Sequence, residues 1–119
     1  MHSPPRDAVL LRIFIGEADR TGGRPLYEAL VLKARELGLA GATVLRGPMG
    51  FGRGSRLHTA KILQLSNDLP MVVEIVDAEA RIHAFLDAAD SMLGSALVTL
   101  EKATVIRYGT GGPADPDIP

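Results

Sequence analysis

Two rounds of strand, helix and strand in the hydrophobic pattern are the feature of this sequence that most constrains its fold. AVLLRIFIG (8–16) alternates apolar residues with a period of two and stops at a glycine, which predicts a β-strand. Apolar residues then recur at helical spacing from about Arg24 to Gly38, and Pro25 suits the first helical position. GATVLRG (41–47) predicts the strand that completes the first round.

The second round follows the same order. HTAKILQLS (58–66) indicates an extended piece, and DLPMVVEIVD (68–77) alternates clearly enough to predict a strand. Asp77 is a good cap for a helix that we expect to end at Gly94, before a last strand over ALVTLEKATVIRY (96–108). This order predicts an α+β fold, the ferredoxin-like βαββαβ sandwich, with two helices on one face of an antiparallel sheet.

The face of that sheet away from the helices would carry a largely apolar surface. Its residues on the first strand and on the strand before the second helix are Leu10, Arg12, Phe14, Val72, Glu74 and Val76. Such a patch favours self-association, because water would otherwise cover it. The two strands are neighbours in this topology, so we expect Arg12 and Glu74 within ion-pairing reach, where they would fix the register of an assembly. The alternative is a shallow solvated pair without an oligomer.

Composition and charge limit the classes of function. At 119 residues the chain fits one domain, and its formal net charge of -1 argues against broad binding to nucleic acid or anionic membranes. With no cysteine, disulfides, thiolate catalysis and cysteine zinc sites are excluded. No apolar run approaches the roughly 18 residues of a membrane span, and the first residues lack the apolar core of a signal peptide, which predicts a cytoplasmic protein.

The ends of the chain differ in character from the middle. We expect a folded domain over residues 8–108, preceded by a flexible tail over residues 1–7. The last residues, 109–119, are rich in glycine and proline and poor in apolar side chains. We therefore expect a disordered C-terminal tail.

The stretch RGPMGFGRGSRLH (46–58) combines four glycines and three arginines without an acidic residue. Glycine lets the backbone approach a ligand closely, and arginine supplies forked donors, so the pattern suits a phosphate or carboxylate group. Anion binding is one hypothesis, and a solvated hairpin tip is the other. Glu17, just after the first strand, is a further candidate site residue because a cleft there could use it.

Several short segments, in their order and spacing, resemble a known family. GLAGATVLRGPMGFGR, LPMVVEIVD and LEKATVIRY, together with FIGEADR and PLYEA, resemble the PII-like signal-transduction proteins, in particular their DUF190 branch within the superfamily that also holds the CutA-like proteins. The resemblance extends over nearly all of residues 9–108. It implies a ferredoxin-like subunit, a homotrimer built on the open sheet face, and ligand sites in the clefts between subunits.

The resemblance also implies which residues bind the ligand. The turn at the base of the family's long flexible loop lines a nucleotide site, a Gly-x-Thr contributes from the neighbouring subunit, and an arginine near the end of the last strand faces phosphate. In this sequence the matching residues are Gly50, Phe51, Gly52, Arg53, Gly41, Thr43 and Arg107.

Three departures from the family pattern bear on the ligand. The glycine- and lysine-rich loop expected before the last strand is missing, and Met71 stands where a lysine would follow Leu-Pro. The tyrosine that some PII proteins modify has no counterpart between Arg53 and Leu69. We therefore expect AMP, ADP, a cyclic dinucleotide or a small anion rather than ATP.

Other constellations have ordinary explanations. Gly47, Gly52, Arg53 and Gly54 imitate P-loop spacing, but the lysine and hydroxyl residue are absent. Ser55 and His58 share one loop without a carboxylate to orient the histidine. Glu79, His83 and Asp87 share a helical face, where a solvated charged surface is more common than a metal site.

The sequence thus predicts a trimeric regulatory protein rather than an enzyme, without cofactor or resident metal. A small anionic ligand, such as an adenine nucleotide, would change the order of residues 52–66 and thereby the docking of a partner protein. By resemblance, a membrane transport protein is the partner class. The alternatives are a CutA-like metal-tolerance protein and an enzyme that acts on a phosphorylated small molecule.

Overall fold

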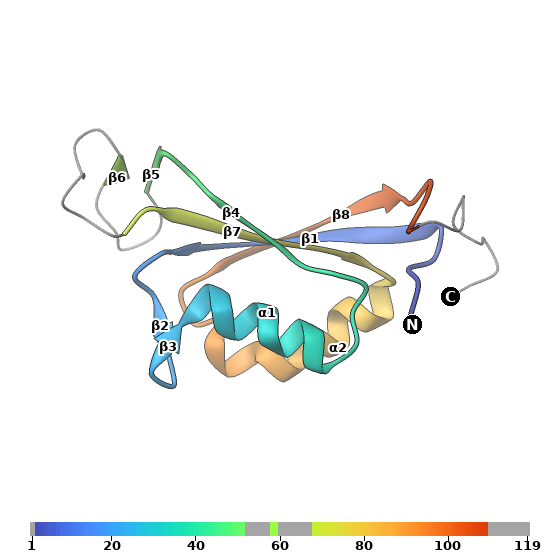
Figure 1. The fold of residues 1–119 in the computed structure, drawn as a ribbon, viewed down its shortest axis with the longest axis horizontal. Helices are drawn as coiled ribbons and strands as arrows, with labels where there is room; N and C mark the ends of the chain where they lie inside the picture. Colours follow the sequence, from blue (N-terminus) through green and yellow to red (C-terminus); the bar gives the residue numbers. More distant parts are fainter. Residues whose placement is uncertain (1, 52–57, 60–67, 110–119) are drawn as a thin grey trace.

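The computed structural model describes residues 2–51, 58–59 and 68–109 of the chain. Its main sheet contains β1 (Asp7–Gly16), β4 (Thr43–Arg46), β7 (Pro70–Asp77) and β8 (Leu97–Thr104), in the order β4-β7-β1-β8, with every pair antiparallel. Two helices, α1 (Leu26–Glu36) and α2 (Glu79–Ala89), cover one face of this sheet (Figure 1). The predicted α+β architecture is confirmed, while the trimer stays a prediction.

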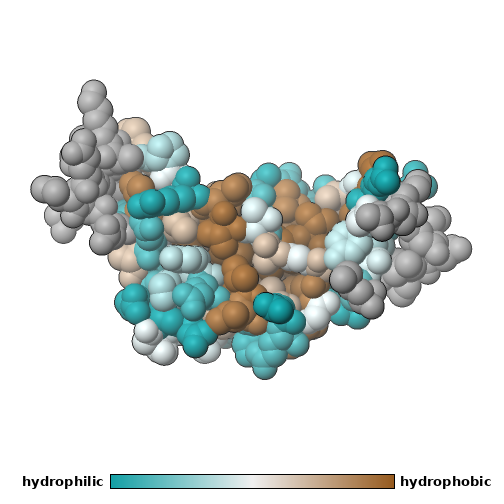
Figure 2. Space-filling view, in the orientation of Figure 1, coloured by the Kyte–Doolittle hydropathy of each residue, from teal (hydrophilic) through white to brown (hydrophobic). Residues whose placement is uncertain are grey.

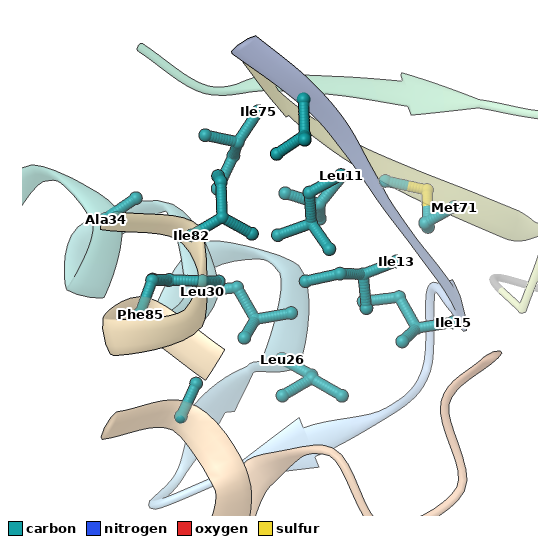
Figure 3. Close-up of a cluster of buried hydrophobic side chains, with 13 residues drawn as sticks. Leu11, Ile13, Ile15, Leu26, Leu30, Ala34, Met71, Ile75, Ile82 and Phe85 are labelled. Carbon is teal, nitrogen blue, oxygen red and sulfur yellow. The ribbon is translucent and has the colours of Figure 1, made fainter. Parts of the chain in front are cut away.

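The core lies between the sheet and the helices and follows from the two periodicities of the sequence. Leu11 on β1 pairs with Ile75 on β7, and alternate residues on both sides of this pair point toward the helices. Helices α1 and α2 contribute residues three or four positions apart, which lie on one helical face. The side chains meet in a single cluster (Figure 3) that includes Leu11, Ile13, Leu30, Val73, Ile75, Ile82 and Phe85.

The helix boundaries differ from those expected. Helix α1 begins at Leu26, and Pro25 is its N-cap with extended geometry (ψ 138°) rather than the first helical residue. Helix α2 is preceded by Ala78, not Asp77, as its N-cap, and a short 3-10 helix η1 (Asp90–Met92) follows it before Gly94. The prediction of Asp77 as the helix cap was wrong, because its carboxylate accepts the hydrogen bonds described below.

A small hairpin precedes α1 where the sequence indicated only a polar loop. Strands β2 (Arg20–Thr21) and β3 (Arg24–Pro25) pair across Gly22 and Gly23, whose φ angles are 55° and 82°. Positive φ at both central positions is what a two-residue type I′ turn needs, and glycine adopts it without steric cost. The backbone N–H of Leu26 donates to the Asp19 carbonyl (2.7 Å), so the hairpin base adjoins the start of α1.

The strand after α1 is interrupted within the glycine-rich stretch. Strand β4 ends at Arg46, the Gly47 N–H donates to the Pro70 carbonyl (2.7 Å), and β5 (Met49–Gly50) then pairs with β6 (His58–Thr59) in a separate hairpin. The rest of the extended piece expected over residues 58–66 lies outside the described residues.

The two ends of the sheet carry different parts of the chain (Figure 1). The hairpin β5–β6 lies at one end, on the left of the figure, while the start of β4 and the end of β8 lie at the other. At this second end Pro4 and Pro5 are buried, and the Val105 N–H donates to the Arg6 carbonyl (2.8 Å). The division of the chain into a domain and two tails stays a prediction, since residues 110–119 lie outside the described residues.

None of the helices in the described residues is long and apolar enough to cross a membrane.

Candidate functional site

A cavity of about 570 Å³ opens on the face of the sheet that the helices leave uncovered. It extends from the loop between α1 and β4, across β7 and β1, to the residues that follow β8. Its wall is mainly apolar, with Leu10 and Val76 on the sheet. Its polar side chains are those of Thr43, Glu74, Thr104, Arg107 and Tyr108. A mainly apolar hollow with a few convergent polar groups is the usual form of a small-molecule site.

Three of the residues predicted to bind the ligand line this cavity. Gly41 and Thr43 lie where the α1–β4 loop enters β4, and Arg107 lies beyond β8 on the opposite edge of the sheet. A Cβ added at Gly41 would meet no atom within 4 Å, so this wall is open above the glycine. The cavity therefore joins residues that are more than 60 positions apart in the sequence.

The other predicted residues that the structure describes lie at the far end of the sheet. Gly50 is in β5, and a Cβ there would come within 3.2 Å of Pro70 Cγ. Phe51 is 74% exposed. Glu17 Oε1 accepts a hydrogen bond from Arg46 Nη2 (3.0 Å), so its carboxylate already has a cationic partner. Gly52 and Arg53 lie outside the described residues.

The register of β7 gives the distance between the two groups of predicted residues: Gly41, Thr43 and Arg107 at the cavity, and Glu17, Gly50 and Phe51 at the other end of the sheet. Val76 lines the cavity, while Pro70 pairs with Gly16 beside Glu17. Thr43 pairs with Glu74, four residues from Pro70, and Val76 is six residues from Pro70, so the separation is about 13 to 20 Å of extended strand. The two groups therefore lie apart along the sheet within one chain.

A charge cluster lies on the uncovered face beside the cavity. Arg12 Nε donates to Glu74 Oε2 (2.9 Å), which confirms the expected pair, and Arg12 Nη1 donates to Glu101 on β8. The hydrogen bond to Glu74 and the negative charges of both carboxylates raise the pKa of Arg12 above its ordinary value, although desolvation opposes the shift. Glu74 therefore presents a compensated charge to the cavity.

Asp77 is a structural residue whose role the sequence analysis missed. It is fully buried, and its two carboxylate oxygens accept hydrogen bonds from the Ala40 N–H (2.9 Å), the Ala78 N–H (2.7 Å) and His2 Nε2 (2.8 Å). Tyr108 was also missed, and its hydroxyl donates to the Ala40 carbonyl (2.6 Å). A polar residue at the end of a buried strand was the available signal for Asp77, but its partners His2 and Ala40 are distant in sequence.

The remaining constellations gain no support as sites. In the part of the chain that the structure describes, no three metal-ligating side chains are grouped as a metal site would require. On α2, His83 Nε2 lies 3.4 Å from Glu79 Oε2, and both side chains are largely exposed. Ser55 lies outside the described residues, as does the side chain of His58.

One family model and several known proteins are similar in sequence to this chain. The DUF190 family model, described as "Uncharacterized ACR", matches residues 8–105. Two UPF0166 proteins from Aquifex aeolicus (strain VF5) are 42% and 32% identical over 97 residues, which cover 82% of this chain and 91% and 95% of theirs. A UPF0166 protein from Methanocaldococcus jannaschii is 35% identical over 80 residues, covering 66% of this chain and 72% of its own.

Solved structures of PII-like proteins have the same fold. CPII, a nitrogen regulatory PII-like protein from Thiomonas intermedia K12, bound to ADP, AMP and bicarbonate, matches with a TM-score of 0.65 and 16% identity, over 85% of this chain and 90% of that one. A putative PII-like signaling protein from Thermus thermophilus matches with a TM-score of 0.62 and 18% identity, over 90% of this chain and 100% of that one. At such identities the likeness shows a shared PII-like fold.

Proposed function

The chain belongs to the DUF190/UPF0166 family, and from that premise we propose that it is a PII-like regulatory protein that binds AMP or ADP between the copies of a trimer. Binding would change how residues 52–66 present themselves to a partner protein, for which a membrane transport protein is the proposed class. The structures of CPII with ADP and AMP support this choice of ligand, because that protein has the same fold.

The observation that carries the proposal is the division of the predicted site into two groups at opposite ends of the sheet. Gly41, Thr43 and Arg107 line the cavity, while Gly50 and Phe51 lie at the other end. A head-to-tail contact between copies would place one group beside the other, and such contacts close into a ring in a cyclic trimer. Each trimer would then contain three equivalent sites.

The uncovered sheet face supports such an assembly. Phe14, Leu45 and Leu97 project from β1, β4 and β8 on this face and are 38%, 48% and 60% exposed. In Figure 2, which views the molecule from the side with the sheet above the helices, hydrophobic residues lie across the middle of the molecule, between more hydrophilic regions. Apolar surface of this kind is stabilised by contact with a second copy, since burial removes it from water.

The chemistry of the cavity suits a nucleotide with one or two phosphates. The Arg107 guanidinium can donate two parallel hydrogen bonds to phosphate oxygens, and the Thr43 hydroxyl can add a third. The apolar wall around Leu10 and Val76 offers a surface for a nucleobase. Met71, which stands at the position of a lysine in the family pattern, is buried in the core, so this position supplies no cation for a third phosphate.

Isothermal titration calorimetry with AMP, ADP, ATP and bicarbonate tests the proposal. We expect the protein to bind ADP more tightly than ATP, and Arg107→Ala to weaken ADP binding about tenfold or more, because a charge-assisted hydrogen bond is lost. Lys102→Ala is the matched control, since it removes an exposed cation from β8 without touching the cavity. Absence of nucleotide binding, or equal losses in the two variants, would contradict the proposal.

A further inference from the structure

We infer that Asp77 and Tyr108 are positioning residues for the ligand cavity, because they hold Ala40 from both sides and thereby place Gly41 and Thr43 in the cavity wall. The inference deepens the proposed function and rests on it for the identity of the ligand. Neither side chain needs to touch the nucleotide for this role.

Asp77 fixes the first side of Ala40. Its carboxylate Oδ2 accepts the Ala40 N–H at 2.9 Å, and Oδ1 accepts the Ala78 N–H at 2.7 Å. His2 Nε2 lies 2.8 Å from Oδ1, within hydrogen-bond distance. One buried side chain thus joins the α1–β4 loop, the start of α2 and the segment before β1. Burial makes these bonds costly to lose, because no water replaces them.

Tyr108 fixes the second side of Ala40. Its hydroxyl donates to the Ala40 carbonyl at 2.6 Å, and its ring is half-buried in the wall of the same cavity. Tyr108 directly follows Arg107 in the chain. A shift of Arg107 toward a bound phosphate would therefore also move Tyr108. Through the hydrogen bond of Tyr108, it would move Ala40 and the adjacent Gly41.

The loop between α1 and β4 depends on these bonds for its position. Leu39 is tied back to α1 through the hydrogen bond from its N–H to the Ala34 carbonyl (3.0 Å), whereas Gly41 has open space where a Cβ would lie. Little packing restrains the backbone at Gly41, so the bonds on either side of Ala40 set the direction in which the chain enters β4. Thr43 lies two residues after Gly41, so the direction of the chain at Gly41 determines the position of Thr43 in the cavity wall.

Hydrogen exchange measured by NMR on the protein without ligand directly tests whether Asp77 and Tyr108 hold Ala40 in place. We expect Tyr108→Phe and Asp77→Asn to speed amide exchange across residues 39–43 about tenfold, while the amides of Ile13 and Val73 in the sheet keep their protection. Tyr27→Phe is the matched control, because it removes the hydroxyl of the other tyrosine, on α1, away from the cavity. Unchanged exchange at residues 39–43 in both variants would overturn the inference.

A second readout separates positioning from a purely structural effect. Tyr108→Phe should weaken ADP binding about three- to tenfold, with a free energy of unfolding equal to that of Tyr27→Phe. An ADP affinity equal to that of the wild type would overturn the positioning role even if exchange became faster. If the wild type binds no nucleotide, the proposed function fails, and the exchange comparison alone then decides whether Asp77 and Tyr108 hold the loop.

Discussion

Arg12 lies between two carboxylates on the sheet face that the helices leave uncovered. It donates to Glu74 and Glu101, and without it two negative charges would remain on a surface that the proposed trimer buries. The residue therefore compensates charge where copies of the chain would meet. Its contribution is expected in assembly more than in the stability of one subunit, since paired charges often specify register.

Substitution of Arg12 by alanine should weaken the trimer because Glu74 and Glu101 lose their shared partner. We expect the association constant to fall roughly tenfold at low salt and to recover partly in about 1 M NaCl, where the Debye length shrinks to about 3 Å. Sedimentation velocity at micromolar protein concentration measures the fractions of monomer and trimer at low and at high salt. Arg24→Ala, an exposed arginine on β3, is the control. A variant trimer as stable as the wild type at low salt would contradict the role assigned to Arg12.

Single residues also show where sequence analysis reaches its limit. The Arg12–Glu74 pair was predictable because each residue alternates with core residues on a strand, and the topology makes the two strands neighbours. Glu101 was not, because its place depends on the register of β8, where it pairs with Leu10 and lies diagonal to Arg12. Two of the partners of Asp77, His2 and Ala40, come from distant segments, and no local pattern in the sequence connects them with it.

At the scale of elements, periodicity predicted the four strands of the main sheet and both helices. The spacing of apolar residues in β1, β7 and α2 indicates which side chains are buried, and these side chains form the core of the tertiary structure. The hairpin β2–β3 was missed because its strands have two residues each and carry no apolar alternation. Its signal was the Gly22–Gly23 pair, which permits a tight turn but does not require one.

The hairpin β2–β3 provides a test of this explanation. Gly23 has a φ of 82°, so Gly23→Ala should lower the free energy of unfolding by about 1 kcal/mol, the cost of a left-handed backbone for a residue with a Cβ. Gly94→Ala is the matched control: its φ is not positive, and its added Cβ would also meet no atom within 4 Å. Urea unfolding measures both variants. Equal stability of the two would contradict the turn geometry.

At the scale of the whole molecule, the residues predicted to bind the ligand lie at two separate places on one chain. The family resemblance indicated which residues would bind a ligand. In the structure, Gly41, Thr43 and Arg107 form a cavity group, while Gly50 and Phe51 form a hairpin group about 13 to 20 Å away along β7. The distance between the two groups could not be predicted from the sequence, because it depends on sheet order and register. In the proposed trimer, each ligand site would combine the cavity group of one copy with the hairpin group of the next.

Complementation between two defective variants tests this central claim most directly. Arg107→Ala removes the cavity group's arginine, and a Phe51→Ala/Arg53→Ala double variant alters the other group, so neither protein alone should bind ADP tightly. When the two are mixed, unfolded and refolded together, about one quarter of the sites in the resulting trimers would combine two intact groups and bind ADP with wild-type affinity. Calorimetric titration of the mixture measures that fraction. A mixture that binds no better than its separate components would contradict a ligand site shared between copies.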